Sequence, residues 1–125
     1  MTAREDIIRN YVAGYNEFDL NKMVRDLDGN IVFENISNGD TNVRLMGLSS
    51  FMDQAEQAAT VFSERKQTIK SFTHQEDNTE VELDYYAVLA VDLPDGLKAG
   101  EELRLQGRSI FTFAGNKIVQ LTDIS

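Results

Sequence analysis

The sequence predicts one α+β domain in which a curved antiparallel sheet wraps its apolar face over N-terminal helices. Two observations carry this prediction. Apolar residues recur at helical spacing through most of the first half of the chain, and four long β-prone segments separated by short turn clusters fill the second half. The length of 125 residues corresponds to one domain, so residues 1–125 are expected to fold as a single unit.

Two helices are expected at the start of the chain. Over residues 3–17 the apolar positions form one helical stripe, and Thr2, three residues before Glu5, resembles a capping box. A second, short helix is expected over residues 20–27, with Asp19 as its N-cap. The apolar positions of the two helices are Ile7, Ile8, Tyr11, Val12 and Tyr15, then Leu20, Met23, Val24 and Leu27.

A short strand and a third helix are expected next. Residues 28–30, Asp-Gly-Asn, predict a turn, and residues 31–36 are β-prone and predict a strand. Residues 37–42 are predicted as loop and residues 43–46 as a brief extended piece. Gly47 then introduces the clearest helical face in the chain, which consists of Leu48, Phe51, Met52, Ala55, Ala58, Ala59 and Phe62.

Four long strands are predicted over residues 66–75, 80–92, 102–113 and 117–124, separated by turn clusters. Short connections between long strands imply an antiparallel meander. Residues 85–91 are apolar on both faces, so one face is expected to meet the core and the other a second chain. The resulting hypothesis is a homodimer through the outer face of the sheet.

Charge and composition exclude several classes of partner and site. With 21 acidic against 12 basic residues the net charge is −9, which argues against nucleic acid and against an anionic membrane as partners. The absence of cysteine excludes disulfides and thiol chemistry, and no His/carboxylate spacing indicates a metal site. The first residues lack the apolar core of a signal peptide, so we expect a cytoplasmic location.

Several residues mark the boundaries of these elements: Tyr11-Val12, Asp19-Leu20, Gly47, and the run Gly-Asn-Lys-Ile-Val at 115–119. In this order they resemble the nuclear transport factor 2-like superfamily, and within it the SnoaL-like and ketosteroid-isomerase-like branch. The resemblance implies a cone-shaped sheet of the cystatin-like type, an interior pocket for a hydrophobic small molecule, and frequent dimers. It implies no cofactor.

The ketosteroid isomerases allow the resemblance to be followed residue by residue. Tyr11 matches the tyrosine that holds the oxyanion, whereas Asn35 stands on the aspartate that shuttles the proton. Ser109 falls where those enzymes keep a protonated aspartate as a second oxyanion donor. Because an amide cannot act as a general base, double-bond isomerisation by that mechanism is disfavoured. Tyr11 remains a candidate donor to a bound carbonyl.

The limonene-epoxide-hydrolase-like branch offers a second comparison. Asn35 matches its asparagine, and Asp123 and Asp84 match the two aspartates that help to activate a water. The sequence departs from that pattern at two positions, with Phe33 in place of a tyrosine and Glu82 in place of the arginine. The central cation would therefore have to come from Arg104 or Arg108 on a neighbouring strand.

SnoaL-type cyclases resemble the chain through an aspartate on the last strand that serves as acid and base in an aldol ring closure, and Asp123 matches it. If Asp123 shares the concave face with Val119 and Leu121, burial would raise its pKa into a range useful for proton transfer. A register shift of one residue would instead place it in water.

The same question of strand parity applies to residues 80–92. Apolar alternation favours an inward face of Val81, Leu83, Tyr85 and Ala87, whereas the hydrolase resemblance favours Glu82, Asp84 and Tyr86. We expect the apolar set to point inward, which weakens Asp84 as a site residue.

The candidate site therefore combines Asp123 as the catalytic group with Tyr11 and Asn35 as polar anchors. The residues expected to contact substrate are Tyr15, Phe33, Phe51, Leu83, Tyr85, Ser109, Phe111 and Leu121. Each also has a structural reading, as core packing for the aromatic residues and as a solvated carboxylate for Asp123. His74 is expected at the surface.

The expected function is that of a SnoaL-like protein that binds a hydrophobic small molecule, as an isomerase, a polyketide-cyclase-like enzyme or an epoxide-hydrolase-like enzyme using acid/base chemistry. The alternative is a ligand carrier or a protein-interaction module of the same fold. A carrier or an enzyme needs an open cavity, whereas an interaction module can fill its cone with side chains.

Overall fold

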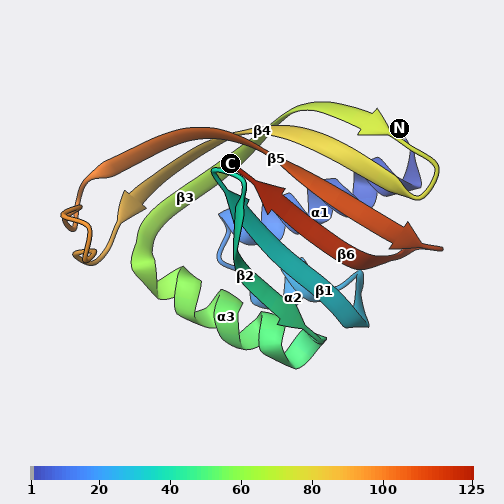
Figure 1. The fold of residues 1–125 in the computed structure, drawn as a ribbon, viewed down its shortest axis with the longest axis horizontal. Coiled ribbons are helices and arrows are strands. Elements are labelled where there is room, and N and C mark those ends of the chain that lie inside the picture. Colours follow the sequence, from blue (N-terminus) through green and yellow to red (C-terminus); the bar gives the residue numbers. More distant parts are fainter. Residues whose placement is uncertain (1) are drawn as a thin grey trace.

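The computed structural model describes residues 2–125, which form a six-stranded sheet with three helices on its concave side (Figure 1). The helices are α1 (Ala3–Asn16), α2 (Leu20–Val24) and α3 (Leu48–Val61). The strands are β1 (Leu27–Ser37), β2 (Asp40–Met46), β3 (Phe62–His74), β4 (Asn78–Leu89), β5 (Glu102–Ala114) and β6 (Lys117–Ile124). Their spatial order is β2-β1-β6-β5-β4-β3, antiparallel except for the parallel pair β1 and β6. The predicted α+β class and the meander of the last four strands are confirmed.

The first two helices begin where their caps predict, but the second ends early. The Thr2 hydroxyl accepts a bond from the Glu5 amide at 3.1 Å, and a carboxylate oxygen of Asp19 accepts one from the Lys22 amide at 3.1 Å. The prediction of a helix to residue 27 is wrong, because Leu27 already pairs with Ile118 of β6. Residues 28–30 lie within β1, at an irregularity in its pairing with β6, rather than in a separate turn.

Strand lengths differ from the predictions where helical and extended patterns adjoin. Phe62, expected on the third helix, begins β3, which starts four residues before the predicted residue 66. The predicted loop over residues 37–42 is in fact a tight hairpin. Asn38 and Gly39 both have positive φ, 54° and 83°, which suits a two-residue turn between β1 and β2. β6 has the predicted bounds.

The core lies between α1 and the strands β4, β5 and β6. Ile8 of α1 is fully buried, as are Val81 and Leu121 on the sheet. α2 packs closely on α1 at Gly14, where an added Cβ would lie 2.7 Å from the Met23 backbone nitrogen. No helix among residues 2–125 has the length and apolar character to cross a bilayer.

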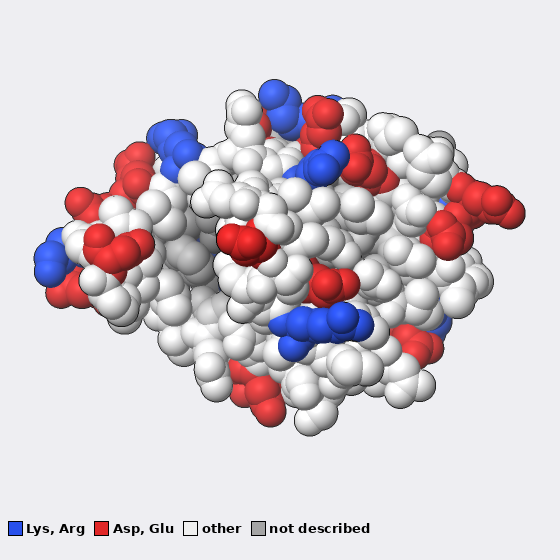
Figure 2. All heavy atoms as spheres, viewed as in Figure 1, with Lys and Arg blue, Asp and Glu red and all other residues white. Residues whose placement is uncertain are grey.

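The sheet curves strongly, so that β3 bends toward α3 (Figure 1). The parity of β4 is the one that apolar alternation predicts: Leu83 is 6% exposed on the concave side, while Asp84 lies outside and pairs with Lys70 at 3.7 Å. Acidic and basic side chains are interspersed over the face shown in Figure 2, which is hollowed at a place bordered mostly by uncharged atoms.

Candidate functional site

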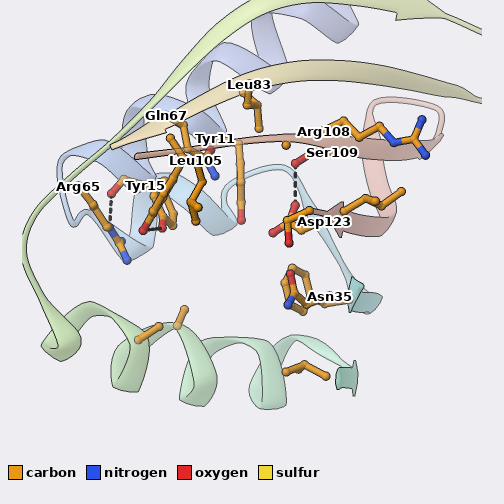
Figure 3. A pocket seen from close by; sticks show the side chains of 18 of the residues that line it. Tyr11, Tyr15, Asn35, Arg65, Gln67, Leu83, Leu105, Arg108, Ser109 and Asp123 are labelled. Carbon is orange, nitrogen blue, oxygen red and sulfur yellow. Dashed lines mark hydrogen bonds between the residues drawn. The ribbon is translucent and has the colours of Figure 1, made fainter. Parts of the chain in front are cut away.

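A cavity of about 430 Å³ lies between the concave face of the sheet and α3, large enough for a small organic molecule. Most of its wall is apolar, and the aromatic part includes Phe33 and Phe51, whose rings meet edge to face at 5.6 Å. Several side chains with a strong hydrogen-bonding group reach the wall or the ends of the cavity (Figure 3), among them Tyr11, Tyr15, Asn35, Arg65, Gln67, Ser109 and Asp123. The cone is therefore hollow, with polar groups facing its interior.

Asp123 lies on β6 between the neighbouring residues Ser109 of β5 and Asn35 of β1. The Ser109 hydroxyl donates a hydrogen bond of 2.7 Å to one carboxylate oxygen, Oδ1. Burial raises the pKa of Asp123 from 3.8 to about 6, and the bond from Ser109 opposes this rise because it favours the charged form. Asp123 is therefore a carboxylate that can take up a proton close to neutral pH.

Tyr11 reaches the same part of the cavity from α1 (Figure 3). The residue is 6% exposed, and its ring meets Phe111 edge to face at 5.6 Å. Burial raises the pKa of Tyr11 well above its usual value, the negative charge of Asp123 raises it further, and Arg65 lowers it. The phenol therefore stays neutral and can donate its proton in a hydrogen bond.

Asn35 stands beside Asp123 across the parallel strand pair, and Figure 3 shows the two side chains on the same wall. Its amide nitrogen donates a bond of 2.8 Å to the side-chain oxygen of Asn42. This bond engages one of the two N–H donors of the amide and leaves the other donor and the carbonyl oxygen without a side-chain partner among residues 2–125.

Farther along the cavity, the Tyr15 hydroxyl donates to the Tyr85 hydroxyl at 2.9 Å, and the pKa of each phenol is raised by burial. Next to this pair lies Arg65, which is not among the residues predicted from the sequence. Arg65 is 3% exposed, and its Nε donates to the Tyr15 carbonyl oxygen at 2.8 Å. The sequence held a signal for it, because Arg65 precedes Gln67 and Ile69 by two and four residues, the period of one strand face.

Two of the expected contact residues do not line the cavity. Phe111 is 1% exposed and Leu121 is fully buried, and both belong to the core at the closed end, beneath α1. On the same two strands the cavity wall begins two residues away, at Ser109 on β5 and at Asp123 on β6. The remaining expected residues reach the cavity: Tyr15, Phe33, Phe51, Leu83, Tyr85 and Ser109.

The cluster of two aspartates and an arginine that an epoxide-hydrolase-like site needs is not assembled. Asp84 faces away from the cavity, and Arg104 pairs with the adjacent Glu102 at 3.3 Å. Arg108 borders the cavity, but its guanidinium pairs with Glu80 at 3.4 Å.

His74 lies away from the cavity wall, and its ring nitrogens contact Glu5 at 2.7 Å and Thr79 at 2.9 Å. Within residues 2–125 no cluster of three or more His, Asp or Glu side chains is arranged to hold a metal ion.

Comparisons with known proteins agree on one fold. A family model described as SnoaL-like domain matches residues 8–121. A candidate polyketide cyclase from Xanthomonas campestris pv. campestris superposes with a TM-score of 0.84 at 16% identity, over 98% of this chain and 90% of that one. A candidate polyketide cyclase from Pseudomonas putida gives 0.76 at 20% identity, over 98% and 90%.

The candidate hydroxylase AclR from Streptomyces galilaeus gives a TM-score of 0.76 at 18% identity, over 96% of this chain and 86% of its own. At these identities the structural likeness shows the fold alone. Among proteins of curated function, none matches the chain by sequence.

Proposed function

The chain belongs to the SnoaL-like domain family, and from this premise we propose that it is an acid/base enzyme acting on a hydrophobic carbonyl compound held in the cavity. Asp123 is the proton acceptor in this proposal, and Tyr11 is the hydrogen-bond donor to the carbonyl oxygen. The reaction class is proton abstraction next to a carbonyl followed by an aldol-type ring closure. The names of the two candidate polyketide cyclases of the same fold support this choice.

The chemistry uses both groups in turn. The Asp123 carboxylate takes a proton from the carbon next to a carbonyl, and the electron pair of the broken C–H bond moves onto the carbonyl oxygen as an enolate. A hydrogen bond from Tyr11 stabilises that oxygen. The enolate carbon then attacks a second carbonyl carbon of the same molecule, and the alkoxide that forms takes the proton back from Asp123.

The observation that carries the proposal is the pairing, in one cavity, of a half-buried carboxylate on the wall with a phenol whose O–H makes no hydrogen bond to the described residues. The pKa of about 6 for Asp123 suits a general base that works near neutral pH. Among residues 2–125 the structure gives the Tyr11 hydroxyl no hydrogen-bond partner, so its donor is available to a ligand. Ser109 by contrast already gives its proton to Asp123 and acts as a positioning residue.

The proposal is tested by hydrogen–deuterium exchange at carbon. Polycyclic aromatic β-keto esters are incubated with the protein in D2O, and deuterium uptake next to the carbonyl is followed by mass spectrometry across pH. The wild-type protein should accelerate uptake with a midpoint at about pH 6, the pKa of Asp123. Asp123→Asn should abolish the acceleration, and Tyr11→Phe should reduce it by roughly 10²-fold, the usual effect of losing one oxyanion donor.

Asp84→Asn is the matched control, because it removes a carboxylate from the outer face of the same sheet. Uptake that is equally fast in the Asp123→Asn protein would refute the role of Asp123. If the probes raise the melting temperature of the protein, but deuterium uptake is equally fast with the wild-type protein and with every variant, the protein is a carrier and not an enzyme.

A further inference from the structure

We infer that the cavity contains a second subsite, built on Arg65, that binds an anionic oxygen group of the substrate such as a carboxylate. This inference rests on the proposed function and adds the substrate class: a hydrophobic carbonyl compound with an acidic group at the end remote from the reacting carbon.

Arg65 is held in an aromatic cage at one end of the cavity. Its guanidinium carbon lies 3.8 Å from the centre of the Tyr15 ring and 4.4 Å from that of the Phe18 ring. Phe18 has a φ of 57°, a left-handed conformation that is unfavourable for a bulky residue. The backbone is thus strained at Phe18, the residue whose ring lies against the Arg65 guanidinium.

The charge of Arg65 is buried without a counter-ion. Among residues 2–125 no carboxylate lies within 4.0 Å of its guanidinium, and its terminal nitrogen Nη2 is buried with no hydrogen-bond partner. A guanidinium does not lose its proton inside a protein, so the cation persists at every accessible pH. The two rings stabilise the cation through their π faces, but they leave N–H donors in the guanidinium plane without an acceptor among the described residues.

A planar group of unfilled N–H donors is complementary to a carboxylate, which can accept two of them at once. Gln67, two residues farther along the inward face of β3, adds a side-chain amide to the same part of the cavity wall. The apolar side chains around both would exclude water from the ion pair and strengthen it.

Arg65 is separate from the site of proton transfer. It lies on β3 and Asp123 on β6, with β4 and β5 between them. The pKa of Asp123 responds to burial and to Ser109, and Arg65 is not among its causes. Figure 3 shows Tyr11 between Arg65 and Asp123, and the charges of both affect the pKa of its phenol. A ligand anchored at Arg65 would therefore extend past Tyr11 toward Asp123.

A purely structural role explains less. The bond from Nε to the Tyr15 carbonyl does join β3 to the last turn of α1. That single contact uses one donor of the five in a guanidinium, and it gives no reason for an unpaired cation on a cavity wall.

The test compares a dihydroxyanthraquinone carboxylate with its methyl ester, which have the same ring system and differ in charge. Binding of each is measured by calorimetry at pH 7 to the wild-type protein and to Arg65→Gln, Arg65→Lys and Arg104→Gln. Arg104→Gln is the matched control, because it removes the same positive charge from the outer face of the sheet. The wild-type protein and the control should prefer the carboxylate by about tenfold or more, the effect of one ion-paired hydrogen bond.

Arg65→Gln should bind both probes with equal affinity, and Arg65→Lys should keep part of the preference. Equal binding of the two probes by the wild-type protein would overturn the inference even if Arg65→Gln does not fold, and so would a preference that survives in Arg65→Gln. Asp123→Asn should retain the preference while losing deuterium exchange. Failure of the anion subsite is thus distinguished from failure of the proposed catalysis.

Discussion

Replacing Asp123 by asparagine should stabilise the protein at neutral pH. The folded state raises the pKa of this carboxyl from 3.8 to about 6, so it holds the proton more tightly than the unfolded chain does. The wild-type protein therefore has the full stability of the protonated group below about pH 4 and loses it progressively as the pH rises to about 6. Asparagine has nearly the same shape, stays neutral throughout, and can still accept the bond from Ser109.

The magnitude follows from the size of the shift. Each pKa unit corresponds to about 1.4 kcal/mol, so the change from 3.8 to about 6 costs the wild-type protein about 3 kcal/mol once the pH exceeds 7. At pH 4 only about 0.5 kcal/mol of this cost is present, because the folded carboxyl is protonated and the unfolded one is partly so. The gain from Asp123→Asn should therefore be about 3 kcal/mol at pH 7.5 and about 0.5 kcal/mol at pH 4.

Urea denaturation at these two pH values gives the free energy of unfolding directly. Asp53→Asn, an exposed carboxylate on α3, is the control for the general effect of removing one negative charge from an acidic protein. A variant that is less stable than the wild-type protein at pH 7.5, or a gain that is the same at both pH values, would refute the claim that burial raises the pKa of Asp123.

Three further predictions concern neighbouring residues. Ser109→Ala removes the bond that lowers the pKa of Asp123, so the midpoint of the pH profile of deuterium exchange should move above that of the wild-type protein; an unchanged midpoint would contradict this. Gly107→Ala places a Cβ 2.9 Å from the Ile124 carbonyl oxygen, so urea denaturation should show a free energy of unfolding lower by about 1–3 kcal/mol. An unchanged free energy of unfolding would show that β6 can shift to make room for the methyl group. Phe51→Ala should cost about 3–5 kcal/mol, since the ring is 4% exposed; a loss below 1 kcal/mol would mean that α3 collapses into the cavity.

The helices and the meander could be predicted because local signals and tertiary contacts agree there. Thr2 and Asp19 cap the helices that they predict, and the predicted bounds of β6 are those observed. The errors occur where pairing between distant strands overrides local preference. Leu27 continues a helical stripe in sequence, yet its backbone pairs with Ile118, ninety-one residues later, and no local pattern contains that contact.

The candidate site was predicted in part, for the same physical reason. Apolar alternation predicted the inward face of Leu83, but it left the side of Asp123 open, and the structure has Asp123 on the cavity wall. Parity could not show where along a strand the core ends and the cavity begins, so Phe111 and Leu121 were expected on the cavity wall and lie in the core.

Arg65 escaped notice because a charged residue near a strand end is usually exposed. Its burial depends on the Phe18 ring and on the carbonyl of Tyr15, fifty residues earlier in the chain.

The homodimer inferred from residues 85–91 stays a prediction. The outer face of the sheet carries the Tyr86 ring, with the guanidinium of Arg104 stacked on it at 4.7 Å. Sedimentation of the wild-type protein and of Tyr86→Glu would test it, since a dimer through this face should dissociate in the variant, and a wild-type monomer would dismiss the idea.

The role of Asp123 as the base of the cavity is tested most directly by measuring its pKa. Side-chain carboxyl carbons can be followed by 13C NMR through a pH titration, and the signal missing from the Asp123→Asn spectrum identifies this residue. We predict a midpoint at about 6. A midpoint close to 3.8, the ordinary value, would mean that water solvates the carboxylate fully and that Asp123 is not the base of this cavity.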